Sequence, residues 1–243
     1  MPDRLDAFLS HRGFGSRSQV RELVRSGKVT VGDAICRDQA RHLRGEEVRV
    51  DGVLIETGLT AATLLVHKPL GLACSHDPGE APLLEDIIPE DYAHLPMEPA
   101  GRLDRDTSGL LIVTSSGDLI HSLTNPRRHI AKRYRIAYSG RLSAHAAERC
   151  AKGMQLEDDP KPTLPARLIL ETPRLDGLST ATLILHEGRY HQVRRMIAAL
   201  GGEVTALHRD RIGGLDLPRD LPPGQVRELS EVEQASLFVE QGA

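Results

Sequence analysis

The sequence of 243 residues has few cysteines and no long apolar segment. Its three cysteines, Cys36, Cys74 and Cys150, lie far apart, and an odd, scattered set does not predict a disulfide framework. Such cysteine usage is typical of the reducing cytoplasm. No run of 18 apolar residues occurs, and the first residues, MPDRLDAFLSHRG, lack the apolar core and cleavage site of a secretory signal. We therefore expect a cytoplasmic protein without a membrane span.

Motifs for metals and nucleotide cofactors are also missing. The eleven histidines and three cysteines show no HxxxH or CxxC spacing, which makes a zinc site unexpected. The chain has no glycine-rich loop of the Walker or dinucleotide-binding type. We expect neither a metal nor an organic cofactor.

A net charge of -3 disfavours nucleic acid at first sight, but the charges are unevenly distributed. Residues 1–30 hold six Lys/Arg and three Asp/Glu, and residues 101–141 hold eight against three. The acidic residues gather in 60–100 and in 212–243. Binding to phosphate depends on local potential, so this composition permits RNA binding without requiring it.

Residues 1–57 have the pattern of a small α/β module. Apolar residues predict two short helices, the second capped by Ser16 and ended by Gly27, followed by valine-rich strands. Arg17, Arg21 and Arg25 recur every four residues and therefore share one helix face. A solvated charge stripe explains these three arginines as well as an RNA contact does.

The whole segment RLDAFLSHRGFGSRSQVRELVRSGKVTV resembles a small RNA-binding domain, first named in a ribosomal small-subunit protein and shared with tyrosyl-tRNA synthetases. In that family the arginine-bearing helix pair lies on the RNA backbone. The resemblance implies a set of RNA-binding residues here: Arg4, Arg12, Arg17, Arg21, Arg25 and Lys28. A domain of this size buries little surface, so we expect it to act as an appendage.

Beyond a short connection near residues 57–62, strands and helices mix without a regular βαβ repeat. Alternating or continuous apolar runs predict strands at 64–67, 110–114, 133–138, 166–170, 180–186 and 204–208. Helices are expected at 143–152, capped by Ser143, and at 190–200, and Ser230 with Glu233 has the spacing of a capping box. We predict an α+β protein, in which the appendage precedes a domain over 62–240 with a mixed, largely antiparallel sheet flanked by helices.

The segment PAGRLDRDTSGLLIVTSSGD, residues 99–118, places two arginines and two aspartates directly before a buried strand. Charged side chains next to a buried strand cost free energy unless they form ion pairs or serve a function. On spacing alone, a surface turn of Arg–Asp pairs is as well supported as a catalytic role. Asp104 and Asp106, separated by one residue, need not converge on a substrate.

GRLDRDTSGLL resembles the signature of the pseudouridine synthases that modify ribosomal uridines, in which the aspartate matching Asp104 is catalytic. Two further segments agree: AKRYRIAY, with the family's Lys-x-Tyr pair at Lys132 and Tyr134, and HEGRYHQVRRMIAALGGEVTALHRDRIGGL. In the latter block the family has a basic residue beside the aspartate, here Arg194. The three motifs occur in the family's order, and the similarity runs from residue 2 to residue 238.

This resemblance implies an isomerase that breaks the bond between ribose carbon 1 and uracil nitrogen 1, turns the base and rejoins it through carbon 5. Asp104 would act ionised in a desolvated pocket, with the charge of Arg194 stabilising it. An isolated strand tyrosine usually belongs to the core, but the motif and the 3% aromatic content favour stacking of Tyr134 on the extruded uracil. Arg102 and Arg105 would hold flanking phosphates or fill the gap left by the base, and Lys132 would bind the substrate.

The segments GRYHQV and AKGMQL and the lack of a basic C-terminal extension make the small-subunit enzymes of the family the most similar. A large-subunit enzyme, an inactive RNA-binding assembly factor and a carboxylate-pair glycosidase are the alternatives. The intact Asp104, Tyr134 and Arg194 disfavour the second, and the lack of a second motif-borne acid disfavours the third. The expected partner is ribosomal RNA or a ribosomal subunit assembly intermediate, and the family suggests a monomer.

Overall fold

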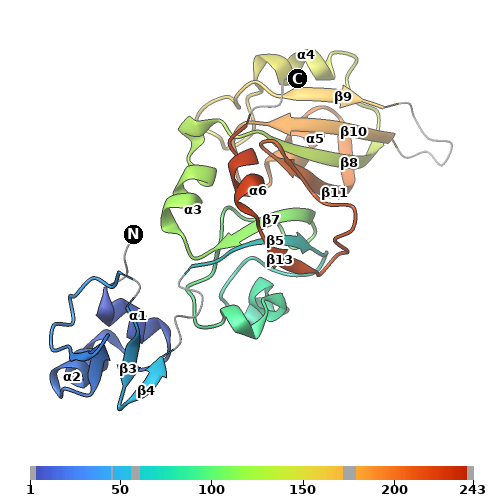
Figure 1. Ribbon diagram of the computed structural model, residues 1–243. Coiled ribbons are helices and arrows are strands. Elements are labelled where there is room, and N and C mark those ends of the chain that lie inside the picture. The colour runs from blue at the N-terminus through green and yellow to red at the C-terminus, as the bar shows by residue number, and fades with distance from the viewer. Residues whose placement is uncertain (1–3, 45, 56–60, 172–178, 240–243) are drawn as a thin grey trace. The chain divides into compact units, whose positions relative to one another are not determined.

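The structure is a computed structural model that describes residues 4–44, 46–55, 61–171 and 179–239 (Figure 1). The chain forms two compact units, one of residues 1–62 with 89–97 and the other of residues 63–88 with 98–243. The predicted domain ends at residues 57 and 240 lie outside the described residues. The division into 1–57 and 62–240 therefore stays a prediction.

The first unit contains the two helices and the valine strands expected from the sequence. They are α1 (Leu5–His11), α2 (Arg17–Arg25), β1 (Val29–Val31), β2 (Ala34–Ile35), β3 (Val48–Val50) and β4 (Val53–Ile55). The strands form an antiparallel sheet in the order β2-β1-β3-β4. The Ser16 hydroxyl accepts from the Gln19 amide in a full capping box, which confirms the predicted start of α2. Apolar residues of both helices pack on the valines to form one core, so this unit has an interior of its own.

The second unit contains a mixed sheet and a set of short helices, as predicted. Its strands are β5 (Thr63–Lys68), β6 (Glu98–Pro99), β7 (Ser108–Thr114), β8 (Lys132–Gly140), β9 (Arg167–Leu170), β10 (Ser179–Leu185), β11 (Gly202–Ile212), β12 (Leu215–Asp216) and β13 (Val226–Glu228). The main order is β13-β5-β7-β11-β8-β10-β9, with β12 beside β11 and β6 beside β7. Within the described residues, β7 and β11 are parallel and the other pairs are antiparallel.

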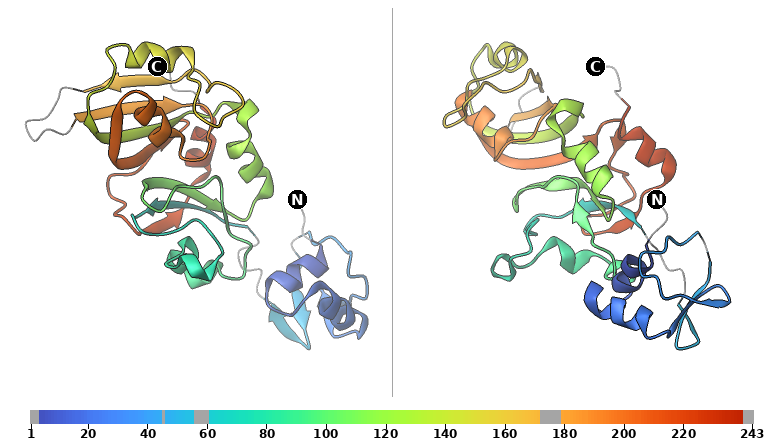
Figure 2. Two further views of the ribbon diagram at one scale, coloured as in Figure 1. Left: turned by 180° about the vertical axis from the view of Figure 1, so that it is seen from behind. Right: turned by 90° about the vertical axis from the view of Figure 1, so that its left-hand side faces the viewer.

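Four α-helices flank this sheet: α3 (Gly117–Thr124), α4 (Ala146–Lys152), α5 (Gln192–Ala199) and α6 (Glu231–Ser236). Single-turn 3₁₀ helices lie in the loops at η1 (Pro78–Glu80), η2 (Leu84–Ile87), η3 (Glu90–Tyr92) and η4 (Pro126–Arg128), with η3 assigned to the first unit. Seen from behind, α5 covers the sheet around β8 and β10 (Figure 2, left). It buries Val193, Met196 and Ile197, the apolar stripe visible in the sequence.

One predicted helix cap is wrong. The helix expected to begin at Ser143 begins at Ala146, with His145 at the N-cap position and no side-chain cap. The Ser143 hydroxyl instead accepts a hydrogen bond from the His145 backbone N–H, before the helix starts. A serine can satisfy turn and cap geometries equally well, which explains the error. The predicted last residue of this helix, Lys152, is confirmed.

The pairing of β8 with β11 sorts their side chains onto two faces of the sheet. In β8, alternation places Lys132 and Tyr134 on one face and Arg133 and Arg135 on the other. Arg209 of β11 lies opposite Tyr134, and a register shift follows directly, so that Arg211 pairs with Arg133. Asp210 is the extra residue of this β-bulge. The bulge lets Arg209 lie on the face of Tyr134 although Arg211 lies on the face of Arg133.

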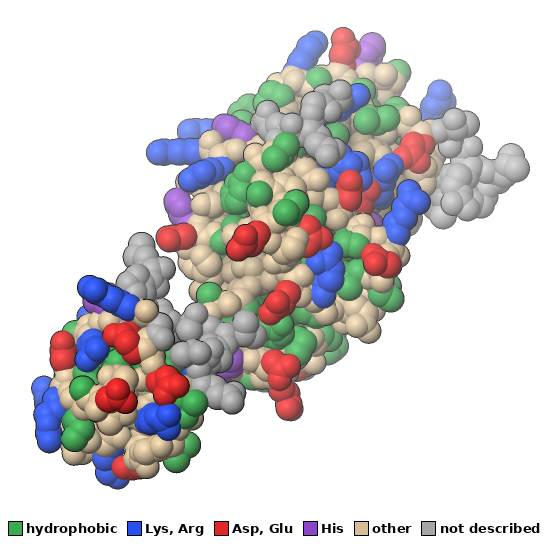
Figure 3. All heavy atoms as spheres, in the orientation of Figure 1, with side chains coloured by type: hydrophobic (Ala, Val, Ile, Leu, Met, Phe, Trp, Pro, Cys, Tyr) green, Lys and Arg blue, Asp and Glu red, His purple; other side chains and the backbone are tan. Residues whose placement is uncertain are grey.

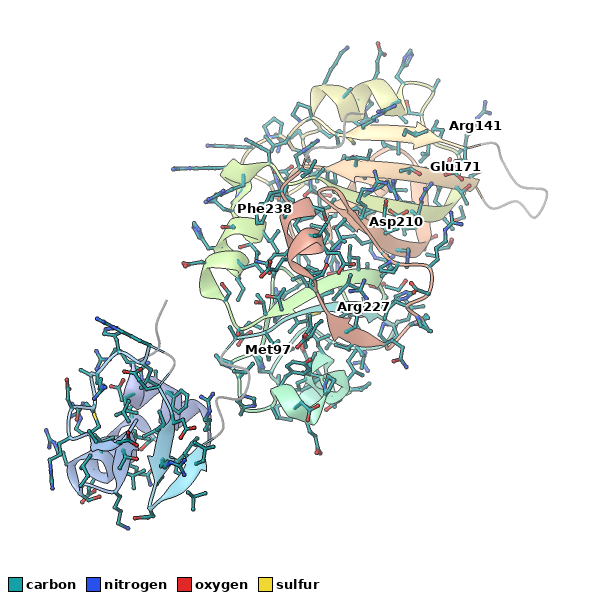
Figure 4. All side chains as sticks on the ribbon, in the orientation of Figure 1. Met97, Arg141, Glu171, Asp210, Arg227 and Phe238 are labelled. Carbon is teal, nitrogen blue, oxygen red and sulfur yellow. The ribbon has the colours of Figure 1, made fainter. Side chains whose placement is uncertain are left out.

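The face of Arg133 and Arg135 has a network of paired charges. Asp210 accepts from the Arg133 Nε at 2.7 Å and from the Arg135 Nε at 2.8 Å, and Asp216 accepts from Arg133 and from Arg211. Figure 3 shows basic and acidic side chains intermixed here, and Figure 4 shows Asp210 and Glu171 on the same face. Each of these guanidiniums therefore has a carboxylate partner.

Glu233, the predicted capping-box residue of α6, also binds Arg227. It accepts from both terminal nitrogens of Arg227, at 2.6 and 2.9 Å, and from the Ser230 backbone N–H at 3.0 Å. The Arg227 hydrogen bonds, helped by those of Ser230, lower the pKa of Glu233 to about 2 against the opposing effect of burial. Because this pKa lies below the unfolded value, ionised Glu233 stabilises the fold above about pH 4.5, and that stability is lost as the pH falls toward 2.

We predict that Glu233→Gln lowers the free energy of unfolding by about 1 kcal/mol at neutral pH, a modest value because both side chains are partly exposed. The difference from the wild type should shrink as the pH falls from about 4.5 toward about 2. Urea unfolding at several pH values measures it, with Glu231→Gln in the same helical turn as the control. An equal difference at every pH would contradict the assignment of the effect to the ionised carboxylate.

Candidate active site

A cavity of about 300 Å³ opens in the second unit, between the loop before β7, the face of the sheet that bears Tyr134, and the N-terminal end of α5. Its walls combine one carboxylate with basic and aromatic side chains: Asp104, Lys132, Tyr134, His191, Arg194 and Arg209. The three segments that the family resemblance singled out are thus brought together in one pocket.

Asp104 lies in the loop between β6 and β7, which a buried lysine holds by its backbone. Lys68, at the end of β5, has a side chain that is 0% exposed. Its ammonium donates to the carbonyls of Pro69, Asp104 and Thr107 at 3.0–3.1 Å. Burial, with a small contribution from the charge of Arg209, lowers the pKa of Lys68 against the opposing charges of Cys74, Asp104 and Asp106. The loop's position therefore does not depend on the Asp104 carboxylate.

The ionisable side chain beside the Asp104 carboxylate is that of His191. The His191 Nε2 lies 3.5 Å from the Asp104 Oδ1, and both side chains are partly exposed, 40% and 33%. His191 precedes α5 with a left-handed backbone, φ 47°, and its ring stacks on Tyr190 at 3.9 Å between centroids. That backbone turns the imidazole toward the pocket.

Arg194 has a different partner from the expected one. Its Nη2 lies 2.7 Å from the Asp106 carboxylate and donates to the Asp106 carbonyl, and its Nη1 donates to the carbonyl of Val204. Arg194 still lines the same pocket as Asp104. The expectation that Arg194 holds Asp104, with Asp106 only a neighbour, is therefore corrected. The conformation of the 104–107 turn decides which carboxylate faces α5, and residue spacing does not reveal it.

Tyr134 and Lys132 extend from β8 into the pocket. Tyr134 is 8% exposed, so its ring is held by packing and only part of it borders the cavity. Lys132 donates to the Ile130 carbonyl at 3.3 Å. Burial, with a smaller contribution from the charge of Arg209, lowers the pKa of Lys132 to about 8. Their roles as substrate-binding residues stay predictions.

Arg209 is a pocket residue that sequence reasoning missed. Its side chain is 2% exposed, its Nε donates to the Leu110 carbonyl at 2.9 Å, and its Nη2 has no partner among the described residues. The segment HRDR shows three charges in a row of four, and only the strand register, with Leu207 opposite Ile136 and Arg209 opposite Tyr134, reveals which charge points inward. Arg209 is therefore a buried arginine on the pocket side of the sheet.

Arg102 and Arg105, on either side of Asp104 in the sequence, differ in exposure and in hydrogen bonding. Arg102 is exposed and lines the pocket, where it can reach a bound strand. Arg105 is not among the lining residues, because its guanidinium donates to the carbonyls of Gly71 and Ala81 at 3.0 and 3.3 Å. In this structure Arg105 therefore holds the 71–81 loop, and its expected contact at the flipped base stays a prediction.

In the first unit, the six expected RNA-binding residues fall into two groups. Arg17, Arg21 and Arg25 are exposed on α2, and their guanidiniums form no salt bridge with any described residue. Arg4 pairs with Asp6 at 2.9 Å, Lys28 with Asp51 at 3.4 Å, and Arg12 lies over the Phe8 ring at 3.7 Å. The arginine row on α2 is therefore the more available part of this set.

Within the described ranges, no helix is long and apolar enough to cross a membrane.

Comparison with known proteins gives the same picture. Residues 62–199 match the family described as RNA pseudouridylate synthase, and residues 3–50 match the S4 domain. The ribosomal small subunit pseudouridine synthase A of Escherichia coli (strain K12) is 38% identical over 96% of this chain and 99% of its own length. The protein of the same name from Vibrio cholerae serotype O1 is 37% identical over 97% and 99%. A solved structure, described as a crystal structure of pseudouridylate synthase, superposes with a TM-score of 0.66 at 32% identity, covering 96% of this chain and 99% of that one.

The family match covers more than half of the chain, the relatives match over nearly the full length, and the pocket holds residues of all three motifs. The chain belongs to the RNA pseudouridine synthase family, as a member with an N-terminal S4 domain.

Proposed function

We propose that this enzyme isomerises a specific uridine of small-subunit ribosomal RNA to pseudouridine, with Asp104 as its catalytic carboxylate. The observation that carries the proposal is that Asp104 borders the same cavity as Tyr134. Lys68 holds the loop of Asp104 by donating to the Asp104 carbonyl. The similarity to proteins named for the small subunit supports the choice of RNA. A large-subunit RNA is the alternative substrate.

The target nucleotide must leave its stack to reach Asp104. Flipping a base costs a few kcal/mol, and stacking on an aromatic ring returns roughly 1–3 kcal/mol. Tyr134, rigid within the sheet, provides such a ring, and Arg102 at the exposed wall can contact the flanking phosphates. Asp104 then acts on the nucleotide, either by adding to the sugar or base or by removing a ribose proton.

The partner of this enzyme is ribosomal RNA, free or within a ribosomal subunit assembly intermediate, and we expect the enzyme to act on it as a monomer. Because ribosomal RNA is the substrate, we place the activity in the cytoplasm, where subunits are assembled.

Mapping of the product tests this function. The protein is incubated with protein-free small-subunit RNA, with large-subunit RNA and with assembly particles, and pseudouridine is located by carbodiimide modification and primer extension. One new stop in the small-subunit RNA is the expected result. A stop only in the large-subunit RNA would favour the alternative substrate, and RNA binding without any stop would indicate an inactive assembly factor.

The arginine row of α2 gives a separate prediction. Replacing Arg17, Arg21 and Arg25 together with glutamine should weaken RNA binding, because fewer neutralised phosphates release fewer counterions. The slope of log K against log salt should become shallower by about 0.7–0.9 for each phosphate that is no longer neutralised. Filter binding across a salt series measures both quantities.

The matched control removes three exposed basic residues of the other unit: Arg141, Lys161 and Arg167. It changes the net charge equally, so a specific RNA surface on α2 should give a larger decrease in affinity than this control. The same decrease in both variants would indicate only a general charge effect.

A further inference from the structure

Two cations of the pocket are removed from solvent, the buried Arg209 and the half-buried Lys132, and both lack an anionic partner among the described residues. Lys132 donates to the carbonyl of Ile130, and Arg209 donates to the carbonyl of Leu110, but neither forms a salt bridge with a described residue. The Arg209 Nη2 is fully buried and has no hydrogen-bond partner in the described part of the chain. A charge removed from water that meets only neutral groups is costly, and proteins seldom keep one without a use.

On the opposite face of the same strands, the arginines are stabilised by carboxylate partners within the protein. There Arg133, 19% exposed, pairs with both Asp210 and Asp216, and Arg135 pairs with Asp210 and Glu171. Lys68, the buried lysine beneath the pocket loop, has three carbonyl acceptors and two aspartates near its charge. The contrast singles out Lys132 and Arg209 as charges left for a ligand.

Lys132 and Arg209 act on the same space. Tyr134 and Arg209 are directly opposite each other on β8 and β11, and Lys132 is two residues from Tyr134 on the same face, which makes it a diagonal neighbour of Arg209. Both line the cavity with Tyr134 and Asp104. The charge that most affects Lys132 is that of Arg209, so like charges are held near each other.

We propose that Lys132 and Arg209 form a cationic floor of the pocket, which binds the carbonyl oxygens of the target uracil and stabilises the negative charge that the base acquires during the reaction. This inference rests on the proposed function. It assigns a catalytic role to Arg209, which no motif singled out, and gives Lys132 a task distinct from holding RNA.

The isomerisation of uridine requires a group that stabilises negative charge on the base. When the bond between ribose C1′ and uracil N1 breaks, its electron pair goes to the ring, and the charge spreads over N1 and the two carbonyl oxygens. After the ring turns, C5 gives an electron pair to C1′ to form the new bond, the C5 proton leaves and N1 takes up a proton, so substrate and product are isomers. Addition of Asp104 to the base would also place negative charge on a carbonyl oxygen. Cations fixed in advance by a sheet stabilise such charge without reorganisation.

The base, and not a phosphate, is the group expected at this floor. Arg209 is 2% exposed and Tyr134 8%, whereas Arg102 on the wall is exposed. A flipped nucleotide enters a pocket with its base foremost, and its phosphates stay with the RNA strand outside. Arg102 is therefore placed for a phosphate, and the pair of cations at the floor is placed for the ring.

The test compares binding with chemistry in Lys132→Met, which keeps the shape of the side chain and removes its charge. On protein-free small-subunit RNA, the single-turnover rate should fall by about 10²–10³-fold, as when one group that stabilises a transition-state oxyanion is removed. The dissociation constant for RNA should stay within about twofold, because every phosphate remains bound. Lys132→Arg should recover most of the rate, and Lys152→Met, which removes an exposed charge from α4, should match the wild type.

Removing an unpaired, largely desolvated charge should leave the melting temperature of Lys132→Met equal or higher, and Lys132→Gln provides a second neutral variant if that protein does not fold. Weaker RNA binding with a shallower salt slope and an unchanged saturating rate would show a phosphate at the floor and overturn the inference. So would a neutral variant with the wild-type rate. If the wild type itself forms no pseudouridine in any RNA, the proposed function fails, which is a distinguishable result.

Discussion

Asp104→Asn will form no detectable pseudouridine, although it will fold and bind ribosomal RNA like the wild type. Asparagine has nearly the shape of aspartate but can neither act as a nucleophile nor accept a proton, so the rate should fall by a factor on the order of 10⁴ or more. The loop should keep its conformation, because Lys68 holds it through the Asp104 carbonyl and not through the carboxylate. The ion pair with His191 that the substitution removes is long, 3.5 Å, and partly exposed.

The measurement is single-turnover pseudouridine formation together with RNA affinity and melting temperature. Asp106→Asn is the matched comparison, since it makes the same change two residues away, on a carboxylate paired with Arg194. We expect this variant to retain far more activity than Asp104→Asn, because Asp106 does not line the pocket and its carboxylate is paired with Arg194. Retained turnover in Asp104→Asn would remove Asp104 from the catalytic role.

Gly109→Ala will unfold the second unit or destabilise it by at least about 3 kcal/mol. Gly109 has φ 118°, a conformation that other residues rarely adopt. A Cβ there would lie 2.1 Å from the Arg209 carbonyl oxygen and 2.7 Å from the Arg209 nitrogen. These are backbone atoms of the parallel partner strand, so relief requires separating β7 from β11 in the middle of the sheet.

Urea unfolding of Gly109→Ala against Gly117→Ala measures the effect. At Gly117, the first residue of α3, a Cβ would meet no atom within 4 Å, so alanine should be neutral or slightly stabilising. If Gly109→Ala folds with the stability of the wild type, a Cβ at this position does not clash with the backbone of β11, and the prediction is contradicted. A folded but slow variant would instead indicate that Arg209 has moved with its strand.

Much of the fold follows from local patterns. The run Leu110–Val113 predicts a buried strand because four consecutive apolar residues can be covered on both faces only inside a sheet, and β7 is buried there. Alternation in β8 correctly separates Lys132 and Tyr134 from Arg133 and Arg135. Capping boxes at Ser16 and Ser230 locate two helix starts, since their hydrogen bonds are local in sequence.

The site follows from the sequence only in part. Motif resemblance brings Asp104, Tyr134 and Arg194 into one region, and all three line the cavity. It does not predict that Arg194 faces Asp106, because this depends on how the backbone turns between Asp104 and Thr107. Nor does it reveal that Arg209 lies on the pocket side while Arg211, after the bulge at Asp210, lies on the opposite face. Turns and bulges shift side chains by one residue without a clear mark in composition.

The paired charges behind the sheet bear on how the enzyme meets its RNA. On that side Arg133, Arg135 and Arg211 are paired with Asp210, Asp216 and Glu171, so their field cancels over a short range. Across the same strands, Lys132 and Arg209 are not neutralised and their field extends through the cavity. The two faces of the sheet therefore differ in electrostatic potential, and the cavity side is the more positive. We therefore expect the negatively charged RNA to be attracted more to the cavity side of the sheet than to the opposite side.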